Sequence, residues 1–437
     1  MKAASTLTFT GDIGFDRYMA RKWEDEQLIA PEVLAFLHAS DHVVANVEGP
    51  LVDPNAPRMH AAEERLMHTI DPAAVCVLRK MHADIWNLVN NHIMDAGEFG
   101  LIKTLESAER EGVRTLGVGR DLAAARTPVI LDEAGGIGLL GVGYRRGCKP
   151  AAEDHGGCLL WNEMDIIREE IEAIKASCRW CVVVAHGGEE FTALPSPYTR
   201  DRYLAYLDMG ADAVVSHHPH VPMNYERVGD KIIFYSLGNF IFDTDYQRAQ
   251  FHTDEGVVLK LRFTEEELGF EAMGIRIDRE QERIMAAPLP TIFTDVPEKD
   301  YLKLEPLAAK MFLAATKRQQ LFLYPEQFAD ATEEQWRDHF LAERRSGRVP
   351  GEGLDFQIIY PLAAEAEAGA WKESPLEDVK RYILKQMEGN APPKRGVVLR
   401  VGPVFRSLEV QPREGGGQAL EAVLDVGVRT VLDGVDP

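Results

Sequence analysis

The chain has 437 residues, of which 48 are basic and 70 acidic, so its formal net charge is −22 at neutral pH. Such an acidic chain argues against a nucleic-acid or anionic-membrane partner, because those partners require basic patches. A small-molecule or polymer substrate that carries phosphate or carboxylate stays compatible, since bound metal reverses the local charge. One core rarely extends over so many residues, so we expect two or more structural units.

The sequence also bears on the compartment. No uninterrupted apolar run approaches the roughly 20 residues of a membrane span, so we expect no transmembrane segment. Residues 1–12 lack a signal-peptide core. Only Cys178 and Cys181, among five cysteines, have CxxC spacing, and zinc-thiolate sites usually need further Cys or His nearby. We expect reduced thiols and a cytoplasmic protein, and an oligomer stays open.

The chain up to about residue 240 alternates between short apolar runs and amphipathic segments. The runs predict strands, and apolar residues spaced three or four apart predict helices. The expected strands cover 7–12, 41–48, 83–89, 113–118, 137–142, 181–186, 213–216 and 231–235. The expected helices cover 27–40, a segment opened by Asp71-Pro, 98–111, 163–177 and 198–209. This alternation favours an α/β fold with mostly parallel pairing.

The pattern changes after residue 240. We expect antiparallel strands at 256–263 and 269–278, charge-rich helices at 299–345 and 359–390, and strands at 397–401 and 408–410. We therefore predict a catalytic core over residues 1–265 and a C-terminal α+β segment over 266–437. That segment would hold a helical insertion at about 299–390 and returning strands at about 396–435, and the sequence assigns it no role.

Ligand-type side chains stand where the predicted strands end. They are Asp12, Glu48, Asn91, His92, His186, His218 and His220. Active sites of open α/β sheets form at such strand ends. A mixed set of oxygen and nitrogen ligands without a thiolate suits Mn, Fe, Zn or Ni. A carboxylate that bridges two ions about 3.5–4 Å apart would create a centre that activates water.

These residues differ in how strongly they indicate a site. Gly-Asp12 and Asn-Val-Glu48 are weak signals alone, and Asn91 is also compatible with turn chemistry. Three histidines within four positions, 217–220, have little structural rationale after a buried run, and His186 is similarly marked. The remaining histidines that lack such a setting are expected on the surface or as satisfied core groups: His38, His42, His60, His68, His82, His155 and His252.

Taken in chain order, six segments carry a family resemblance. They are Gly11-Asp12 with Arg17, Asn46-Val-Glu48, Asn90-Asn91-His92-Ile-Met-Asp95-Ala-Gly97, His186-Gly-Gly-Glu-Glu190, residues 210–221 with His218-Pro-His220, and Tyr235-Ser-Leu-Gly-Asn239-Phe-Ile-Phe-Asp243. Over about residues 5–262 the chain resembles the CapA-like family, the poly-γ-glutamate capsule synthesis proteins, within the calcineurin-like metallophosphoesterase superfamily.

The resemblance implies a four-layer α/β-sandwich with one or two divalent metal ions, Mn, Fe or Zn, at strand ends. It implies metal-binding roles for Asp12 and His220 on the first ion, Glu48 as the bridge, and Asn91, His186 and His218 on the second. His92 would protonate the leaving oxygen, with Asp95 orienting it. Substrate contacts would come from Arg17, Asn46, Glu190 and Asn239. A loop-fixing salt bridge is the alternative for Arg17.

One position departs from the superfamily. Its usual first motif is Asp-x-His, whereas this chain has Asp12-Ile-Gly14. CapA-like proteins generally lack this His, so the departure follows the family. One ligand of the first metal is therefore missing. Asp16 is an alternative ligand, although its spacing is wrong for a simple exchange. Whether one or two ions bind stays open.

Three functions follow. The first is a metal-dependent hydrolase in which metal-activated water attacks a phosphoester. The second is a factor for synthesis or processing of poly-γ-glutamate, acting on γ-glutamyl amide bonds. The third is a non-catalytic binding protein with the same fold. The retention of seven candidate residues argues against it: Asp12, Glu48, Asn91, His92, His186, His218 and His220.

Overall fold

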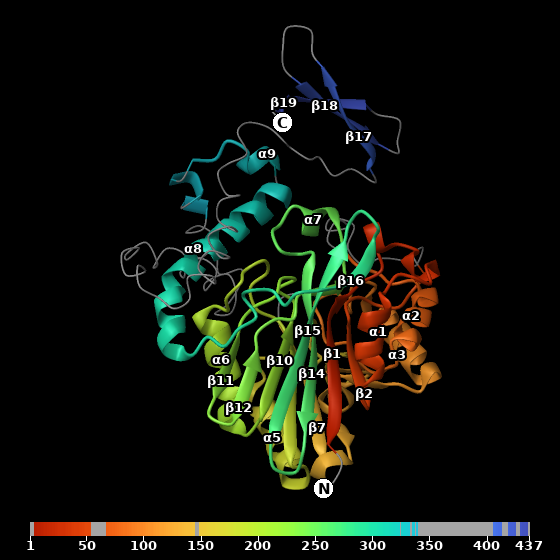
Figure 1. The fold of residues 1–437 in the computed structure, drawn as a ribbon, viewed down its shortest axis with the longest axis vertical. Helices are drawn as coiled ribbons and strands as arrows, with labels where there is room; N and C mark the ends of the chain where they lie inside the picture. Colours follow the sequence, from red (N-terminus) through yellow and green to blue (C-terminus); the bar gives the residue numbers. More distant parts are fainter. Residues whose placement is uncertain are drawn as a thin grey trace. The chain divides into compact units, whose positions relative to one another are not determined.

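The computed structural model describes residues 4–53, 67–144, 148–323, 325–332, 334–336, 338–339, 405–412, 418–424 and 429–435. The chain divides into two compact units near residue 308. The expected boundary at 265 falls in the turn between two paired antiparallel strands of the first unit, β14 and β15. All the candidate site residues belong to the first unit, which Figure 1 shows with its strands labelled.

The first sheet has the strand order β16-β15-β14-β1-β2-β3-β4, and β13 also pairs with β1. Its strands are β1 (Ser5–Ile13), β2 (His42–Val47), β3 (Ala83–Asn87), β4 (Arg114–Leu116), β13 (Asn239–Ile241), β14 (Glu255–Phe263), β15 (Leu268–Asp278) and β16 (Arg283–Ala287). Strands β1 to β4 are parallel to one another, and β13 is parallel to β1. Strands β14 to β16 extend the sheet in antiparallel fashion.

The second sheet has the order β11-β12-β10-β9-β7-β6. Its strands are β6 (Val129–Leu131), β7 (Ile137–Gly143), β9 (Trp180–His186), β10 (Ala213–His217), β11 (Tyr225–Val228) and β12 (Lys231–Phe234). The four inner strands are parallel, and the edge strands β6 and β11 are antiparallel to their neighbours. The short strands β5 (Val118–Gly119) and β8 (Gly157–Cys158) form a separate pair.

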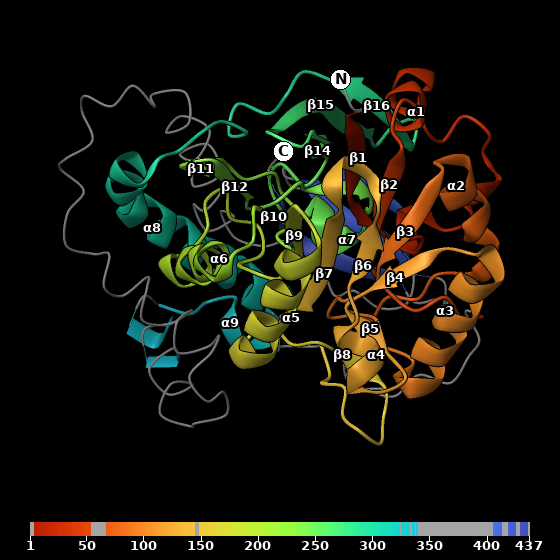
Figure 2. The ribbon, with the colours of Figure 1, turned by 90° about the horizontal axis from the view of Figure 1, so that it is seen from below.

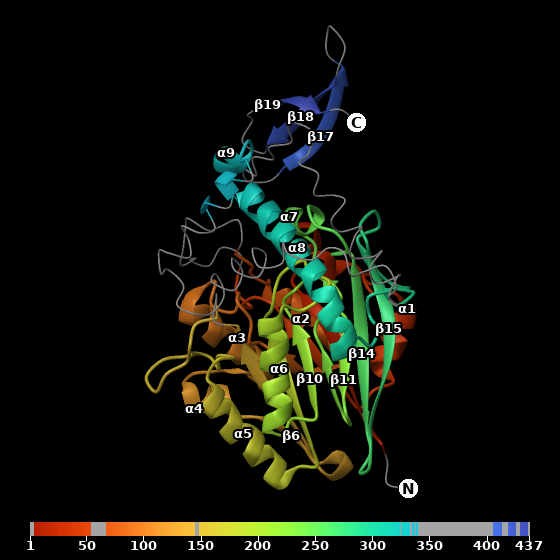
Figure 3. The same cartoon turned by 90° about the vertical axis from the view of Figure 1, so that its left-hand side faces the viewer.

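Helices cover the outer faces of both sheets. They are α1 (Pro31–His38), α2 (Val75–Lys80) and α3 (Gly97–Glu111) on the first sheet, and α5 (Met164–Ser177) and α6 (Pro197–Met209) on the second. The short helix α4 (Leu122–Arg126) packs on β5 and β8, and the short helix α7 (Asp245–Arg248) follows β13 in the chain. Figure 2 shows α2 and α3 beside β3 and β4, and Figure 3 shows α5 and α6 in front of the strands of the second sheet. The first unit thus has the layer order helix, sheet, sheet, helix, which confirms the predicted α/β-sandwich.

The sequence of β9 explains how the layers hold together. Successive side chains of a strand point to opposite faces. Val182 and Val184 accordingly lie in the core between the two sheets, whereas Cys181, Val183 and Ala185 lie in the core under α5 and α6. Both faces are buried, as is usual for a parallel strand rich in β-branched residues. Burying each valine side chain contributes about 1.5–3 kcal/mol.

Most expected elements of the core are present. Helix α6 begins after Ser196, whose hydroxyl accepts from the Thr199 backbone N–H, and ends at Gly210, which has φ of +123°. Helix α1 starts at Pro31, later than expected, because the backbone of residues 28–30 instead pairs with Ile284 of β16. The edge strands β6 and β11 and the strand β16 were not expected from the sequence.

The C-terminal part contains α8 (Glu298–Leu323), α9 (Pro325–Phe328) and an antiparallel sheet of β17 (Phe405–Pro412), β18 (Gln418–Leu424) and β19 (Arg429–Val435). The expected helix at 359–390 and strand at 397–401 lie outside the described residues. Across the described ranges, no helix combines the length and the apolar character that crossing a membrane requires.

Candidate metal centre

Polar side chains from both sheets meet at the carboxyl ends of the parallel strands. Asp12 lies near the carboxyl end of β1, and Glu48 directly follows β2. His186 is the last residue of β9 and pairs in register with His217, the last residue of β10. The side chains of these four residues are almost completely buried. Parallel strands bring their carboxyl ends to the same edge, which is why residues so distant in sequence meet.

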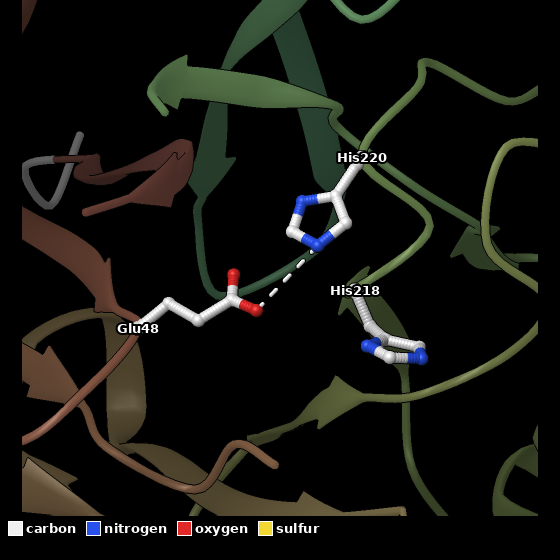
Figure 4. Close-up of side chains that lie close together, drawn as sticks. All are labelled: Glu48, His218 and His220. Atoms are coloured by element: carbon white, nitrogen blue, oxygen red, sulfur yellow. Dashed lines mark ion pairs between the residues drawn. The ribbon is translucent and has the colours of Figure 1, made fainter. Parts of the chain in front are cut away.

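Glu48 lies at the centre of this cluster. Its Oε1 is 3.6 Å from Nε2 of His186, 3.6 Å from Nε2 of His220 and 4.0 Å from Nε2 of His92. Figure 4 shows Glu48 reaching from one side toward His220 and His218 on the other. Among the described residues, Glu48 belongs to two groups of ligand atoms that all lie within 4.8 Å of one another. They are Glu48 with His218 and His220, and Glu48 with Asp12 and His186.

The Glu48 carboxylate has the environment of a metal ligand. Its side chain has no exposed area, and within the described part of the chain no group donates a hydrogen bond to either oxygen. Oδ2 of Asp12 is also buried without a hydrogen bond. Burial raises the pKa of Glu48 to about 8. A buried carboxylate without donors is costly unless a cation compensates it, so this donor set fits a divalent metal ion.

Asp12 and His220 form an ion pair, and an asparagine side chain contacts each of them. Oδ2 of Asp12 lies 3.1 Å from Nδ1 of His220. Asn46 Nδ2 donates to Oδ1 of Asp12 at 2.8 Å, and Asn239 Oδ1 lies 2.9 Å from Nδ1 of His220. Burial alone would lower the pKa of His220, but the carboxylates of Glu48 and Asp12 outweigh it and raise that pKa to about 10.

The pKa of His186 is shifted in the opposite direction to that of His220. Its Nε2 lies 2.9 Å from Oδ1 of Asn91, so the histidine and the amide come together as the resemblance implies for one ion. Burial, followed by the neighbouring imidazoles, holds the pKa of His186 well below its usual value. A neutral imidazole is the form that coordinates metal.

The loop after β10 holds two of the histidines in unusual backbone geometry. His218 has φ of +97° and His220 has φ of +58°, in the region that favours glycine. A non-glycine residue there costs on the order of 1–3 kcal/mol, and such residues cluster at functional sites. The backbone of His218 and His220 is therefore strained in the conformation that holds their two imidazoles near Glu48.

His92 stands beside the cluster with a fixed orientation. Its Nδ1–H donates to Oδ2 of Asp95 at 2.7 Å, which leaves Nε2 on the side of Glu48. Burial lowers the pKa of His92, but Asp95 and Glu48 outweigh it, so the pKa is raised overall. The arrangement can hold a proton at Nε2.

The four candidate substrate residues occupy different environments. Arg17 is exposed and has φ of +52°. Glu190 is half-buried, and Tyr246 donates a hydrogen bond to it at 3.4 Å. Asn46 and Asn239 are buried beside Asp12 and His220. Their amide groups are engaged inside the protein, Asn46 with Asn87 and Asn239 with Gln247 and the Thr253 carbonyl.

The structure gives a steric reason for Gly14. A Cβ added there would lie 2.8 Å from ring carbons of Phe242, so the ring occupies the space that a larger side chain would need. Asp16, the alternative ligand, points elsewhere, because its Oδ2 accepts from Nδ1 of His68 at 2.6 Å.

Two histidines near the site were given no individual role by the sequence. His217 is buried with Nδ1 3.7 Å from Oδ1 of Asp12, and burial lowers its pKa to about 4. Its place in the histidine cluster could have indicated this. His68 was expected on the surface or as a satisfied core group, and it is a buried histidine paired with Asp16. Its ring also packs edge-on against His92, with centroids 4.3 Å apart, which was not expected. Its sequence neighbourhood has no periodicity that could have indicated this contact.

Comparison with known proteins places these residues in a wider context. The PGA biosynthesis protein CapA of Bacillus subtilis (strain 168) is 30% identical over 249 residues, which cover 56% of this chain and 65% of that protein. The capsule biosynthesis protein CapA of Bacillus anthracis is 27% identical over 254 residues, covering 56% and 61%. The chain thus spans less than two thirds of the length of these relatives.

A solved structure of a hypothetical protein from Thermus thermophilus aligns with 65% of this chain and all of that one, at 16% identity and a TM-score of 0.39. The model of the family described as "Bacterial capsule synthesis protein PGA_cap" matches residues 6–244, more than half of the chain. The chain therefore belongs to the PGA_cap family, a family of the metallophosphoesterase-like superfamily.

Proposed function

We propose that this protein is a metal-dependent hydrolase that cleaves a phosphoester. The observation that carries the proposal is the carboxylate of Glu48, fully buried, without hydrogen-bond donors among the described residues, and surrounded by three imidazoles. Burying a carboxylate without hydrogen-bond donors lowers the stability of a structural core, whereas a metal site requires such a carboxylate as a ligand.

The ligands would divide over two positions that share Glu48, in the way that the family resemblance implies. Asp12 and His220 would serve one ion, Asn91, His186 and His218 the other, and Glu48 both. The two groups of close ligand atoms divide the same side chains differently, because they join His220 with His218 and Asp12 with His186. A bound divalent ion supplies activated water and polarises the ester. Because Gly14 leaves the first position one ligand short, we propose that it binds its ion more weakly than the second position does.

His92 would act as the proton donor. Asp95 fixes its Nδ1–H, so the proton available for chemistry sits on Nε2. As the water oxygen bonds to phosphorus and the ester P–O bond breaks, this proton passes to the leaving oxygen. Arg17 and Glu190 would bind charged or polar parts of the substrate from the exposed side, whereas Asn46 and Asn239 would hold Asp12 and His220 in place.

We further propose that the reaction serves synthesis of a poly-γ-glutamate capsule, because the two Bacillus relatives carry capsule and PGA biosynthesis names. The same names favour a second candidate, an enzyme that acts on γ-glutamyl amide bonds of that polymer. Both reactions use activated water and a proton donor, so the same residues support either one.

The test begins with metal analysis of the purified protein. We expect Mn, Fe or Zn by elemental analysis, and less than a tenth of an equivalent after reconstitution would end the metal proposal. A metal-supplemented screen then compares phosphomonoesters, phosphodiesters and γ-glutamyl peptides. Glu48→Gln should abolish turnover, and Glu189→Gln, which alters a buried carboxylate beside the site, serves as a comparison. Turnover of γ-glutamyl peptides alone would overturn the phosphoester proposal.

A further inference from the structure

Two imidazole–carboxylate pairs lie in contact beside the metal centre. The first is His92 with Asp95, joined at 2.7 Å, and the second is His68 with Asp16, joined at 2.6 Å. The two imidazole rings meet edge to face, with centroids 4.3 Å apart and an interplanar angle of 81°. Only the first pair has a role in the proposed reaction.

A single oxygen connects the pairs. Oδ2 of Asp95 accepts the Nδ1–H of His92, and the same oxygen accepts the backbone N–H of His68 at 2.7 Å. The position of Asp95 therefore depends on where the backbone of His68 lies. Since Asp95 fixes the orientation of the His92 ring, a shift at His68 would pass directly to His92.

The side chain of His68 is itself held on two sides. Its Nδ1–H donates to Asp16, in the loop after β1, and its ring packs against Phe242 with centroids 4.9 Å apart. The side chains of His68 and Asp16 are only 11% and 14% exposed. Burial raises the pKa of Asp16, but His68 outweighs this and lowers it overall, so Asp16 is an ionised acceptor.

We infer that His68 is a positioning residue that, anchored by Asp16 and Phe242, holds Asp95 and thereby fixes the Nδ1–H tautomer and the orientation of His92. The inference rests on the proposed function of His92. It also gives Asp16 a role other than metal binding. Phe242 would anchor the His68 ring, and the space that its own ring needs explains why residue 14 is a glycine.

The test uses three variants and a matched control. His68→Ala removes the anchor, His68→Asn keeps a donor that can reach Asp16, and Asp16→Asn removes the ionised acceptor. The control is His42→Ala, because Nδ1 of His42 donates to Oδ2 of Asp84 at 2.6 Å, the same pair chemistry. His42 begins β2, whereas Glu48 follows the end of that strand, so the control lies away from the site.

The first measurement needs no activity. Ring nitrogen NMR shifts of His92 in metal-free protein are assigned by their loss in His92→Ala. Recorded above the raised pKa of His92, where the ring carries one proton, they report its tautomer. We expect a protonated Nδ1 in the wild type, in His42→Ala and in His68→Asn, and a mixture of tautomers in His68→Ala and Asp16→Asn. An unchanged His92 tautomer in folded His68→Ala would overturn the inference. If that variant does not fold, an unchanged tautomer in Asp16→Asn does so.

The second measurement is turnover of a nitrophenyl phosphodiester by metal-loaded protein. For His68→Ala we expect kcat to fall roughly 10–100-fold, as for other residues that orient active-site groups, with KM changed less than about twofold. His68→Asn should recover most of the loss, and an equal loss in His42→Ala would indicate a general structural effect and refute the inference. If the wild type turns over no phosphoester, the proposed function fails, and the tautomer measurement still decides the role of His68.

Discussion

The buried carboxylate of Glu48 should destabilise the metal-free protein, so Glu48→Gln should stabilise it. Folding removes this group from water without supplying a hydrogen-bond donor from the described residues, and burial raises its pKa from 4.5 to about 8. Gln has nearly the same volume and no charge. His220 keeps Asp12 as its ion-pair partner in the variant.

The sign and size of the effect follow from proton linkage. The unfolded chain loses the Glu48 proton near pH 4.5, but the folded protein keeps it until about pH 8. The stability of the metal-free wild type should therefore fall as pH rises between these values. A full proton of difference costs on the order of 1 kcal/mol per pH unit, so from pH 5.5 to 7.5 the wild type should lose a few kcal/mol of stability relative to Glu48→Gln. Glu48→Gln also removes the larger of the two carboxylate charges that raise the pKa of His220, so both groups contribute to this difference.

Urea unfolding of chelator-treated protein at the two pH values measures the free energy of unfolding. Glu189→Gln is the control, because its buried carboxylate accepts hydrogen bonds from Ser196 and Thr199. Glutamine replaces one of the two accepting oxygens by an NH2 group, so at least one of these hydrogen bonds is lost, which should destabilise the control by about 1–3 kcal/mol. Two results would refute the reasoning. One is a Glu48→Gln variant that is no more stable than the wild type at pH 7.5. The other is a difference in free energy of unfolding between the two proteins that does not change with pH.

Three further predictions concern other parts of the site and core. His92→Ala should lose hydrolysis but keep its metal, and loss of metal in elemental analysis would mean that His92 is a ligand. Gly14→His should destabilise the protein by about 1–3 kcal/mol through overpacking against Phe242, and adding Phe242→Ala should relieve part of that cost in a double-mutant cycle. Glu226→Ala should cost about 3–5 kcal/mol in urea unfolding, because it leaves buried Arg200 without its bidentate partner; a loss below about 1 kcal/mol would contradict this.

The sequence pattern predicts the α/β fold with parallel strands well because these strands are short apolar runs bounded by ligand-type residues, whereas the four-layer sandwich was implied by the family resemblance. The run Cys181–Ala185 is buried on both faces, and the residue that ends it, His186, reaches the cluster. Local patterns of this kind determine both the strand and the position of its last side chain. The edge strand β11 was not expected, because Tyr225–Val228 is short and only partly buried.

Contacts between segments without a local pattern could not be predicted. His68 contacts both His92 and Asp16, which lies in the loop after β1, and these residues are far from His68 in the sequence. The conflict between Phe242 and a side chain at position 14 likewise depends on the parallel pairing of β13 with β1. Residues 14 and 242 are far apart in sequence, and no spacing rule relates them.

The candidate ligands come from both sheets, which has a mechanical consequence. Asp12 and Glu48 belong to the first sheet, and His186, His218 and His220 follow strands of the second. An ion held by ligands from both sheets would act as a cross-link between layers whose shared core is apolar. Metal addition should therefore slow amide hydrogen exchange in β1 and β9, far beyond the ligands themselves, by suppressing separation of the sheets.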